Sequence, residues 1–171
     1  RSFIASWAKV AKNNPFKIAR NHLHHEQIGT VMDIYSTIVD ASNSSSPAKH
    51  PVDGVSLLPQ LSGKNNQERP NHFMCHFPHS HRSSYFTSFR KGDWKLIYRY
   101  LTSGGKRKNK DPLPKYELYN LKSDPYETKN LALKNSKKTN EMIRLMSKQL
   151  ETENALFPVR DDLELRPELI K

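Results

Sequence analysis

Two groups of histidines are the residues of this sequence best suited to chemistry. His22, His24 and His25 stand beside Glu26, and a second group follows the pattern H-x-x-H-x-H over residues 76–81. Neither group has the H-E-x-x-H spacing that places two imidazoles on one side of a helix, and no cysteine accompanies them at the spacing of a zinc site. We therefore expect no metal site in this chain.

The end of the second histidine group is a candidate for binding an oxyanion. His79, His81 and Arg82 lie in a predicted loop after a strand, and each side chain can donate hydrogen bonds. Arginine is suited to planar, bidentate contact with sulfate-like oxygens. We take these three as candidate substrate-binding residues. An ordinary polar surface loop would contain the same residue types.

The single cysteine, Cys75, is the only thiol that could act as a nucleophile. It alternates with Phe73 and Phe77 along a predicted strand at residues 72–77, so the three share one side of that strand. This pattern favours a small buried hydrophobic residue over a reactive thiol. We therefore predict no catalytic residue here.

The charge of the chain is strongly positive, with a formal net charge of +11. The excess runs through most of the chain and reverses over residues 151–171, which carry 3 Lys/Arg against 6 Asp/Glu. A basic cluster at residues 106–110 is typical of a solvated loop or of a surface that binds a polyanion. It has no interleaved aromatic residues, so we expect no nucleic-acid partner. No apolar run approaches the ~18 residues of a membrane span.

The elements that must position these residues follow from periodicity. Alternating residues at 85–90 and 94–100, separated by a glycine-containing turn, predict a β-hairpin in which Trp94, Leu96, Tyr98 and Tyr100 share one face. A further strand is predicted at 116–121. A helix capped by Ser136 is predicted over 137–153, and it should pack through Met142, Leu145, Met146, Gln149 and Leu150. This order indicates an α+β fold, with a small antiparallel sheet covered by a C-terminal helix.

The first part of the sequence predicts less regular structure. A helix is expected over 34–41 with Asp33 as its N-cap, and a helical turn over 56–61. The predicted buried face of the helix over 34–41 comprises Val31, Ile34, Tyr35, Ile38 and Val39. Because the chain opens inside an apolar stretch at residues 2–7, we interpret Arg1 as a truncation point.

Four segments resemble the sulfatase family, in order and at the right spacing. Residues 32–41 resemble its D-[LI]-[YF]-P-T segment, with Ser36 in place of proline, and residues 52–63 resemble its D-G-x-S-L-x-P-x-L-x-G segment. Residues 90–97 resemble its R-x-G-x-W-K-L hairpin. Residues 117–132 are similar to its E-L-[YF]-[ND]-L-x-x-D-P-x-E-x-x-N-L-A signature. Within that signature, Asp124 should accept local N–H groups in a turn, and Asn130 should tie the loop before the helix.

The resemblance implies a parent enzyme that hydrolyses sulfate esters. Such enzymes use a formylglycine made in a C/S-x-P-x-R motif and a Ca²⁺ ion held mainly by Asp and Asn. No such motif occurs here, because the proline after Cys75 falls one position too late and no arginine follows. The formylglycine and Ca²⁺ are therefore expected in a preceding N-terminal part. Residues 1–63 would be the remnant of the α/β catalytic domain, and residues 64–171 the C-terminal subdomain, inactive alone.

The resemblance also implies partners, and the net charge of +11 leaves an alternative beside it. The substrate would be a sulfated small molecule or polysaccharide, and the parent protein would be secreted or periplasmic. The alternative is a non-catalytic basic module that binds polyanions such as sulfated polysaccharide. A phosphatase-like or phosphonate-hydrolase-like relative is a third possibility within the superfamily.

Overall fold

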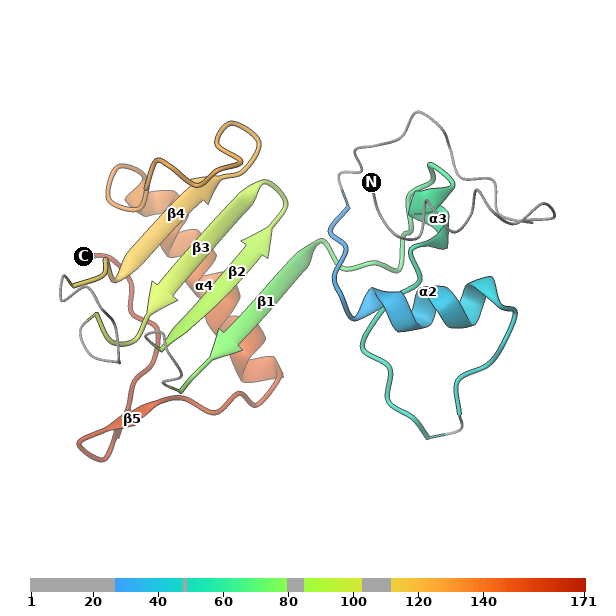
Figure 1. Cartoon of the computed structure of the whole chain (residues 1–171). Coiled ribbons are helices and arrows are strands. Elements are labelled where there is room, and N and C mark those ends of the chain that lie inside the picture. Colours follow the sequence, from blue (N-terminus) through green and yellow to red (C-terminus); the bar gives the residue numbers. More distant parts are fainter. Residues whose placement is uncertain (1–26, 48, 80–84, 103–111) are drawn as a thin grey trace. The chain divides into compact units, whose positions relative to one another are not determined.

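The computed structural model describes residues 27–47, 49–79, 85–102 and 112–171. The chain divides into two compact units, Arg1–Asn71 (unit 1) and His72–Lys171 (unit 2) (Figure 1). The division after residue 63, and the assignment of the first part to a larger α/β domain, stay predictions. No helix among the described residues is long and apolar enough to cross a bilayer.

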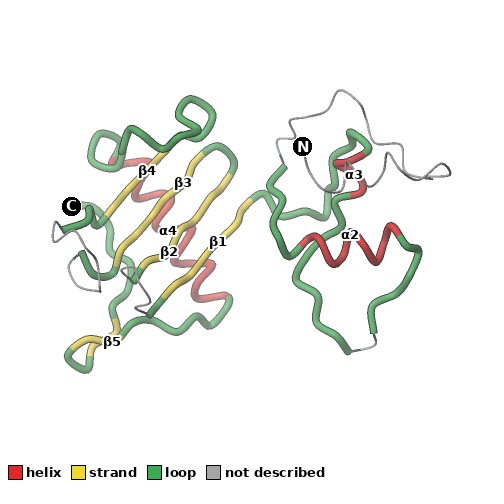
Figure 2. The backbone as a smooth tube through the Cα atoms, in the orientation of Figure 1, coloured by secondary structure: helices red, strands yellow, loops and turns green. Residues whose placement is uncertain are grey.

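Unit 2 is built on a four-stranded antiparallel sheet. The strands follow one another in the order β1-β2-β3-β4, so each pairs with its neighbour in sequence (Figure 2). This confirms the predicted hairpin, the strand after it and the α+β class. The strands are β1 His72–Phe77, β2 Phe86–Lys91, β3 Trp94–Arg99 and β4 Tyr116–Asn120.

The turn between β2 and β3 explains how the hairpin closes. Lys91 pairs with Trp94, which leaves Gly92 and Asp93 as a two-residue turn. Gly92 has φ +55°, a value that residues with a Cβ rarely adopt. A positive φ at the first turn residue alone is typical of a type II′ turn. The twist of this turn matches that of the two strands it joins in a hairpin with a two-residue loop.

One face of the sheet is covered by α4, Ser136–Thr152 (Figures 1 and 2). The predicted helix and its packing are confirmed, although the predicted face was partly wrong. Ile143, which was not predicted, is buried, whereas Gln149 is only half-buried. The buried apolar cluster between the two layers comprises Phe89, Leu96, Tyr98, Tyr100, Leu118, Ala132, Met142, Ile143, Met146 and Leu150.

The cap of α4 also differs from the prediction. Asn135, not Ser136, is the N-cap residue, and its side-chain oxygen accepts a hydrogen bond from the Lys138 N–H at 3.2 Å. Asparagine is as good a cap as serine, so residue type alone did not decide between the two neighbours.

Two predicted tethers in the connection from β4 to α4 are confirmed. Asp124 accepts hydrogen bonds from the N–H groups of Thr128 at 3.1 Å and Lys129 at 2.8 Å. Asn130 accepts from the Leu118 and Ala132 N–H groups through Oδ1 and donates to the Tyr116 carbonyl. The connection is therefore fixed along the outer edge of β4.

The end of the chain returns across unit 2 after a small hairpin of β5, Val159–Arg160, and β6, Leu163–Glu164. Asn140 of α4 holds Ile170 by two hydrogen bonds, of 3.0 Å to its carbonyl and 2.8 Å from its N–H. The Tyr98 hydroxyl contacts the Arg166 carbonyl and the Glu168 N–H, each at 3.3 Å.

Unit 1 contains the predicted helix, α2 Asp33–Ala41, and the predicted helical turn, α3 Leu58–Leu61. The predicted buried face of α2 is wrong, because Val31 and Ile38 are 82% and 60% exposed, whereas Asp33 and Thr37 are buried. On this polar side, Asp33 accepts a hydrogen bond from the Val55 N–H, and Thr37 accepts one from the Leu57 N–H.

Asp33 does not cap α2, which corrects a second prediction. The N-cap position is Met32, without a side-chain bond, and the Asp33 carboxylate instead forms a buried ion pair with Arg69 at 2.8 Å. The same carboxylate accepts the N–H groups of Thr30 at 2.6 Å and Val55 at 2.9 Å. Arg69 therefore joins α2 to distant parts of unit 1.

The Arg69 guanidinium completes this polar centre by donating to backbone carbonyls. Its acceptors are the carbonyls of Ile28 at 3.1 Å, Val55 at 2.5 Å and Ser56 at 3.2 Å. Gly54 lies directly against the start of α2, and a Cβ there would collide with the Met32 backbone. The close approach of these two segments requires a residue without a side chain.

Candidate functional site

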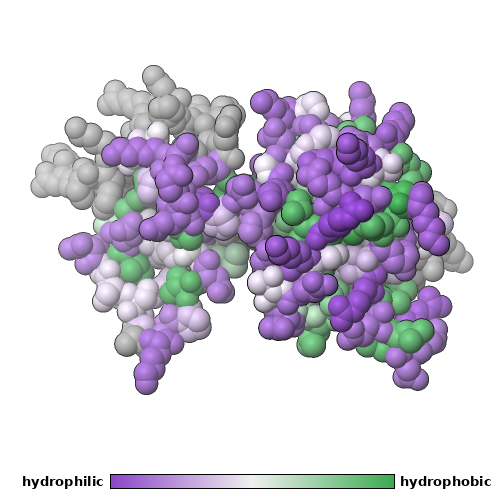
Figure 3. Space-filling model, turned by 180° about the vertical axis from the view of Figure 1, so that it is seen from behind, coloured by the Kyte–Doolittle hydropathy of each residue, from purple (hydrophilic) through white to green (hydrophobic). Residues whose placement is uncertain are grey.

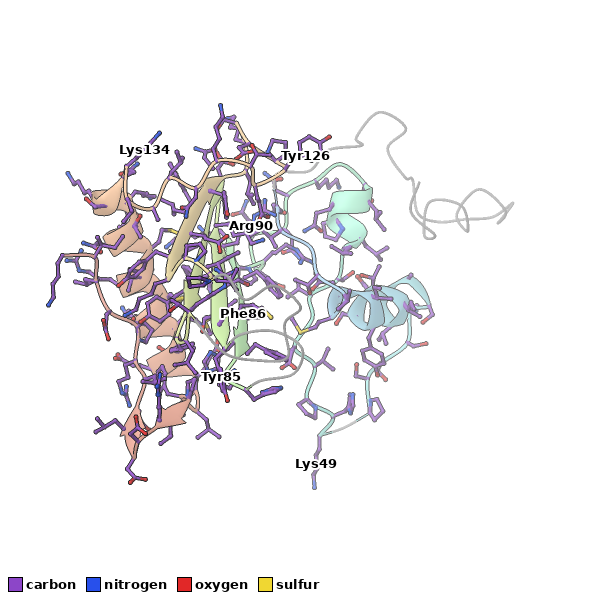
Figure 4. All side chains as sticks on the ribbon, turned by 60° about the vertical axis from the view of Figure 1, so that its left-hand side comes forward. Lys49, Tyr85, Phe86, Arg90, Tyr126 and Lys134 are labelled. Carbon is purple, nitrogen blue, oxygen red and sulfur yellow. The ribbon has the colours of Figure 1, made fainter. Side chains whose placement is uncertain are left out.

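The side of the sheet away from α4, here called the open face, holds the described part of the candidate site. Successive residues of a strand point to opposite faces, and Phe89 points to the core. Phe86 therefore points to the open face, and the register places it opposite Phe77 on β1 and Arg99 on β3. Figure 4 shows Phe86 and Arg90 on this side.

Three rings form an aromatic ledge where β1 ends and β2 begins. Phe77 and Phe86 stack with their centroids 5.7 Å apart, and the His79 ring lies 4.1 Å from that of Phe77. His79 is exposed, and the two phenylalanines are half-buried. The ledge, defined as Phe77, His79 and Phe86, can pack against the apolar face of a ring-shaped ligand while the imidazole makes a hydrogen bond.

Of the three predicted substrate-binding residues, the structure places one. His79 lies on the ledge, whereas His81, Arg82 and the basic cluster at 106–110 fall outside the described residues. The two phenylalanines were not assigned to a site from the sequence. The available signal was an aromatic residue at each end of the short connection between two alternating strands.

Arg99, beside the ledge, is already paired. It forms an ion pair with Glu117, and the Tyr119 hydroxyl donates to the other Glu117 oxygen at 2.5 Å. Burial and the adjacent Glu117 carboxylate raise the pKa of Tyr119 above its usual range. The Tyr119 hydroxyl therefore keeps its proton, and the Glu117 carboxylate contacts both this hydroxyl and the Arg99 guanidinium. The Arg99 guanidinium is thus held at the sheet by its ion pair with Glu117.

His76 points to the other face of the sheet and serves the fold. Its Nδ1 lies 2.7 Å from the Thr87 hydroxyl, and its Nε2 lies 2.8 Å from the Leu156 carbonyl. The Thr87 hydroxyl also contacts the Tyr100 hydroxyl at 2.8 Å, and burial raises the pKa of Tyr100 to about 12. Both nitrogens of His76 are occupied by these bonds, so neither is available to a metal ion.

Cys75 is exposed, and the prediction that it is buried is wrong. Alternation places Cys75, Phe73 and Phe77 on one face of β1, but it does not say which face a helix will cover. Met74 on the opposite face packs against the core instead. Among the described residues, no group of three or more His, Cys, Asp or Glu side chains could hold a metal ion.

Comparison with known proteins places the chain in a family. The family model described as N-sulphoglucosamine sulphohydrolase, C-terminal, matches residues 11–155. A search of curated proteins found no match.

Three solved structures are similar to this chain over 71% of its length, and the chain spans 24% of each of theirs. One is a protein in complex with its substrate D-glucosamine-2-N,6-O-disulfate (24% identity, TM-score 0.49). The others are a protein assigned as a sulfatase from Bacteroides thetaiotaomicron VPI-5482 (23%, 0.51) and a 2-O GAG sulfatase (23%, 0.50). At identities of 23%, the likeness to the last two structures shows a shared fold alone.

Proposed function

Because the chain belongs to the family of N-sulphoglucosamine sulphohydrolase C-terminal parts, we propose that it forms the substrate-contacting C-terminal part of an enzyme that hydrolyses sulfate esters. The aromatic ledge carries this proposal. It combines two stacked phenylalanine rings with an exposed imidazole at the end of a rigid sheet. His81 and Arg82 follow His79 closely in sequence and would add donors for sulfate oxygens.

The substrate class proposed for the parent enzyme is a sulfated sugar. A pyranose ring has an apolar face that can lie on Phe77 and Phe86, and its sulfate oxygens can accept a hydrogen bond from His79. The description of one similar structure as a GAG sulfatase supports the same class.

The chain by itself is proposed to lack sulfatase activity. Hydrolysis needs a nucleophile and positive charge at the sulfuryl oxygens, and the sequence contains no C/S-x-P-x-R segment. The described residues also offer no cluster of acidic ligands that fits Ca²⁺. The residues of this chain would therefore orient the substrate, and a preceding part of the enzyme would supply the nucleophile and Ca²⁺.

The alternative is a non-catalytic basic module that binds polyanions, which the net charge of +11 favours. The coding sequence upstream of Arg1 separates the two. A C/S-x-P-x-R motif there supports the enzyme, and its absence from the whole protein supports the module.

The ledge can be tested in the whole enzyme with Phe86→Ala and His79→Ala, using Tyr126→Ala as the control for loss of an exposed aromatic. Each ledge variant should lower kcat/KM on a sulfated disaccharide about tenfold, and should leave kcat/KM on a small aryl sulfate unchanged. Arg82→Ala should have an effect of the same size if its loop reaches the substrate. Equal losses on both substrates would contradict a role in sugar binding, and turnover by the 171-residue chain alone would contradict the proposed division of labour.

A further inference from the structure

Exposed lysines gather at one end of unit 2. Four exposed lysines, Lys122, Lys129, Lys134 and Lys137, come from the connection between β4 and α4 and from the first turn of α4. None of them forms an ion pair among the described residues. We call these four residues the lysine end.

The lysine end lies at the end of the sheet opposite the aromatic ledge. The turn after β4 is tied to the β2–β3 turn by a hydrogen bond of 2.7 Å from the Leu121 N–H to the Asp93 carbonyl. The start of α4 lies at the same place, because the Lys138 ammonium is 5.7 Å from the centroid of the Trp94 ring. Figure 4 shows Tyr126 and Lys134 at this end of unit 2.

Three of the acidic side chains nearby are already engaged. Asp124 accepts the backbone N–H groups of its own turn, which lower its pKa below the usual value. Glu127 pairs with Lys95 at 2.7 Å, and Glu141 pairs with Lys138 at 2.7 Å. Asp124 keeps its charge beside Lys129, and Asp93 is exposed in the β2–β3 turn. The four lysines still outnumber these two carboxylates, so the lysine end carries a net positive charge.

The order of charges along α4 does not favour the stability of the helix. Cations are favourable at the C-terminus of a helix and anions at its N-terminus, yet Lys137 and Lys138 lie in the first turn and Glu151 lies in the last. The helix has no acidic residue in its first turn and no basic residue in its last. The outer side of unit 2 that carries α4 is mostly hydrophilic (Figure 3). An external anion would relieve the repulsion at the first turn.

We propose that the lysine end binds a chain of acidic, sulfated polysaccharide. Lysine ammonium groups are compact point charges suited to sulfate groups spaced along a flexible polymer. Proteins that bind single-stranded nucleic acid interleave stacking aromatics with their cations. Of the aromatic rings described at this end, Tyr126 is 87% exposed, and Trp94 is half-buried beneath Lys138. Tyr126 and Leu133 alone would bury little apolar area in a membrane. The proposal goes beyond the proposed function, since it requires neither hydrolysis nor the ledge.

The test compares two triple variants of the full chain that lose the same charge. Lys122→Gln/Lys129→Gln/Lys134→Gln removes three members of the lysine end. Its control removes three other exposed cations, Arg144→Gln/Lys148→Gln/Lys171→Gln. Binding of heparin, a single-stranded oligodeoxynucleotide and phosphatidylserine-containing vesicles is measured at several salt concentrations, with circular dichroism to verify folding.

The expected result is that heparin binds more tightly than the other two probes. The lysine-end variant should weaken heparin binding about tenfold or more and flatten its salt dependence, whereas the control should change it about twofold or less. Equal weakening by both variants would reduce the effect to net charge and overturn the proposal. Tighter binding of the oligonucleotide or the vesicles, lost in the same variant, would overturn it in favour of that partner. Both results are independent of sulfatase activity.

Discussion

Unit 1 is organised around a buried ion pair, whereas unit 2 is organised around an apolar core. In unit 1, Asp33 and Arg69 connect the start of α2 to two backbone segments, residues 28–30 and 55–56, and the large apolar side chains of α2 are exposed. In unit 2, the sheet and α4 enclose a continuous cluster of buried apolar residues. Buried ion pairs fix geometry but add little net stability, while apolar burial supplies most of it. Unit 2 therefore has its own source of stability, whereas in the described part of unit 1, residues 27–47 and 49–71, the ion pair mainly specifies the geometry.

The largest effect should come from removing one partner of the ion pair. Arg69→Met leaves the Asp33 carboxylate buried without its cation and should destabilise unit 1 by about 3–5 kcal/mol. Amide hydrogen exchange at residues 54–58 should then accelerate, while the exchange of β2 and β3 stays slow.

Two further variants sharpen this prediction. Asp33→Asn/Arg69→Met should recover part of the loss, because it no longer buries a lone charge. Lys49→Met, which removes an exposed cation of unit 1, should have little effect. Unchanged exchange in Arg69→Met would mean that the ion pair does not hold unit 1 together.

The next effect should come from the core of unit 2. Leu118 is fully buried between the sheet and α4, so Leu118→Ala should lower the free energy of unfolding by about 2–5 kcal/mol. Leu133→Ala is the matched control, because this leucine is 78% exposed. Urea unfolding followed by circular dichroism measures both. Similar losses in the two variants would show that the core contributes no more than the surface.

The smallest and most selective effect should come from pH. Burial alone would raise the pKa of Asp33, but hydrogen bonds from Thr30 and Val55 and the Arg69 guanidinium outweigh it and lower that pKa. The stabilisation is complete above the unfolded value of about 3.9 and is lost as pH falls through the folded value. Acid should therefore loosen unit 1 first.

Alkali should act on the other unit. Burial raises the pKa of Tyr100 to about 12. Its contribution is complete below the unfolded value of about 10 and is lost as pH rises toward the folded value. Stability measured across both ranges, with proteolytic mapping of the cleaved unit, checks the pair of predictions. Tyr100→Phe should reduce the alkaline loss only. If both units unfolded at the same pH, in acid or in alkali, the proposed difference between the two units would be contradicted.

Most features that depend on local sequence were predictable, although the N-cap of α4 was predicted one residue too late. The hairpin around Gly92, the turn at Asp124 and the tether at Asn130 each require contacts set by nearby residues, and all were confirmed. The length of α4 and most of its buried face followed from periodicity for the same reason.

Features that depend on distant partners were not predictable. Arg69 lies 36 positions from Asp33, and no periodic pattern links them. The exposure of Cys75 and of the apolar side of α2 depends on which faces become covered, which alternation cannot specify. For the candidate site, the histidine was identified from its chemistry. The stacking of Phe77 on Phe86 needed the register of β1 with β2.

The contact of Gly54 with α2 has a genetic consequence. Every missense change at a glycine codon introduces a Cβ, and at position 54 any Cβ would occupy space taken by the backbone of Met32. Backbone cannot rotate aside as a side chain can. The start of α2 would therefore have to separate from the segment whose Val55 carbonyl accepts a hydrogen bond from Arg69. The Gly54 codon should therefore tolerate synonymous changes only, whereas the Gly92 codon, with open space around the glycine, is constrained by its backbone angle alone.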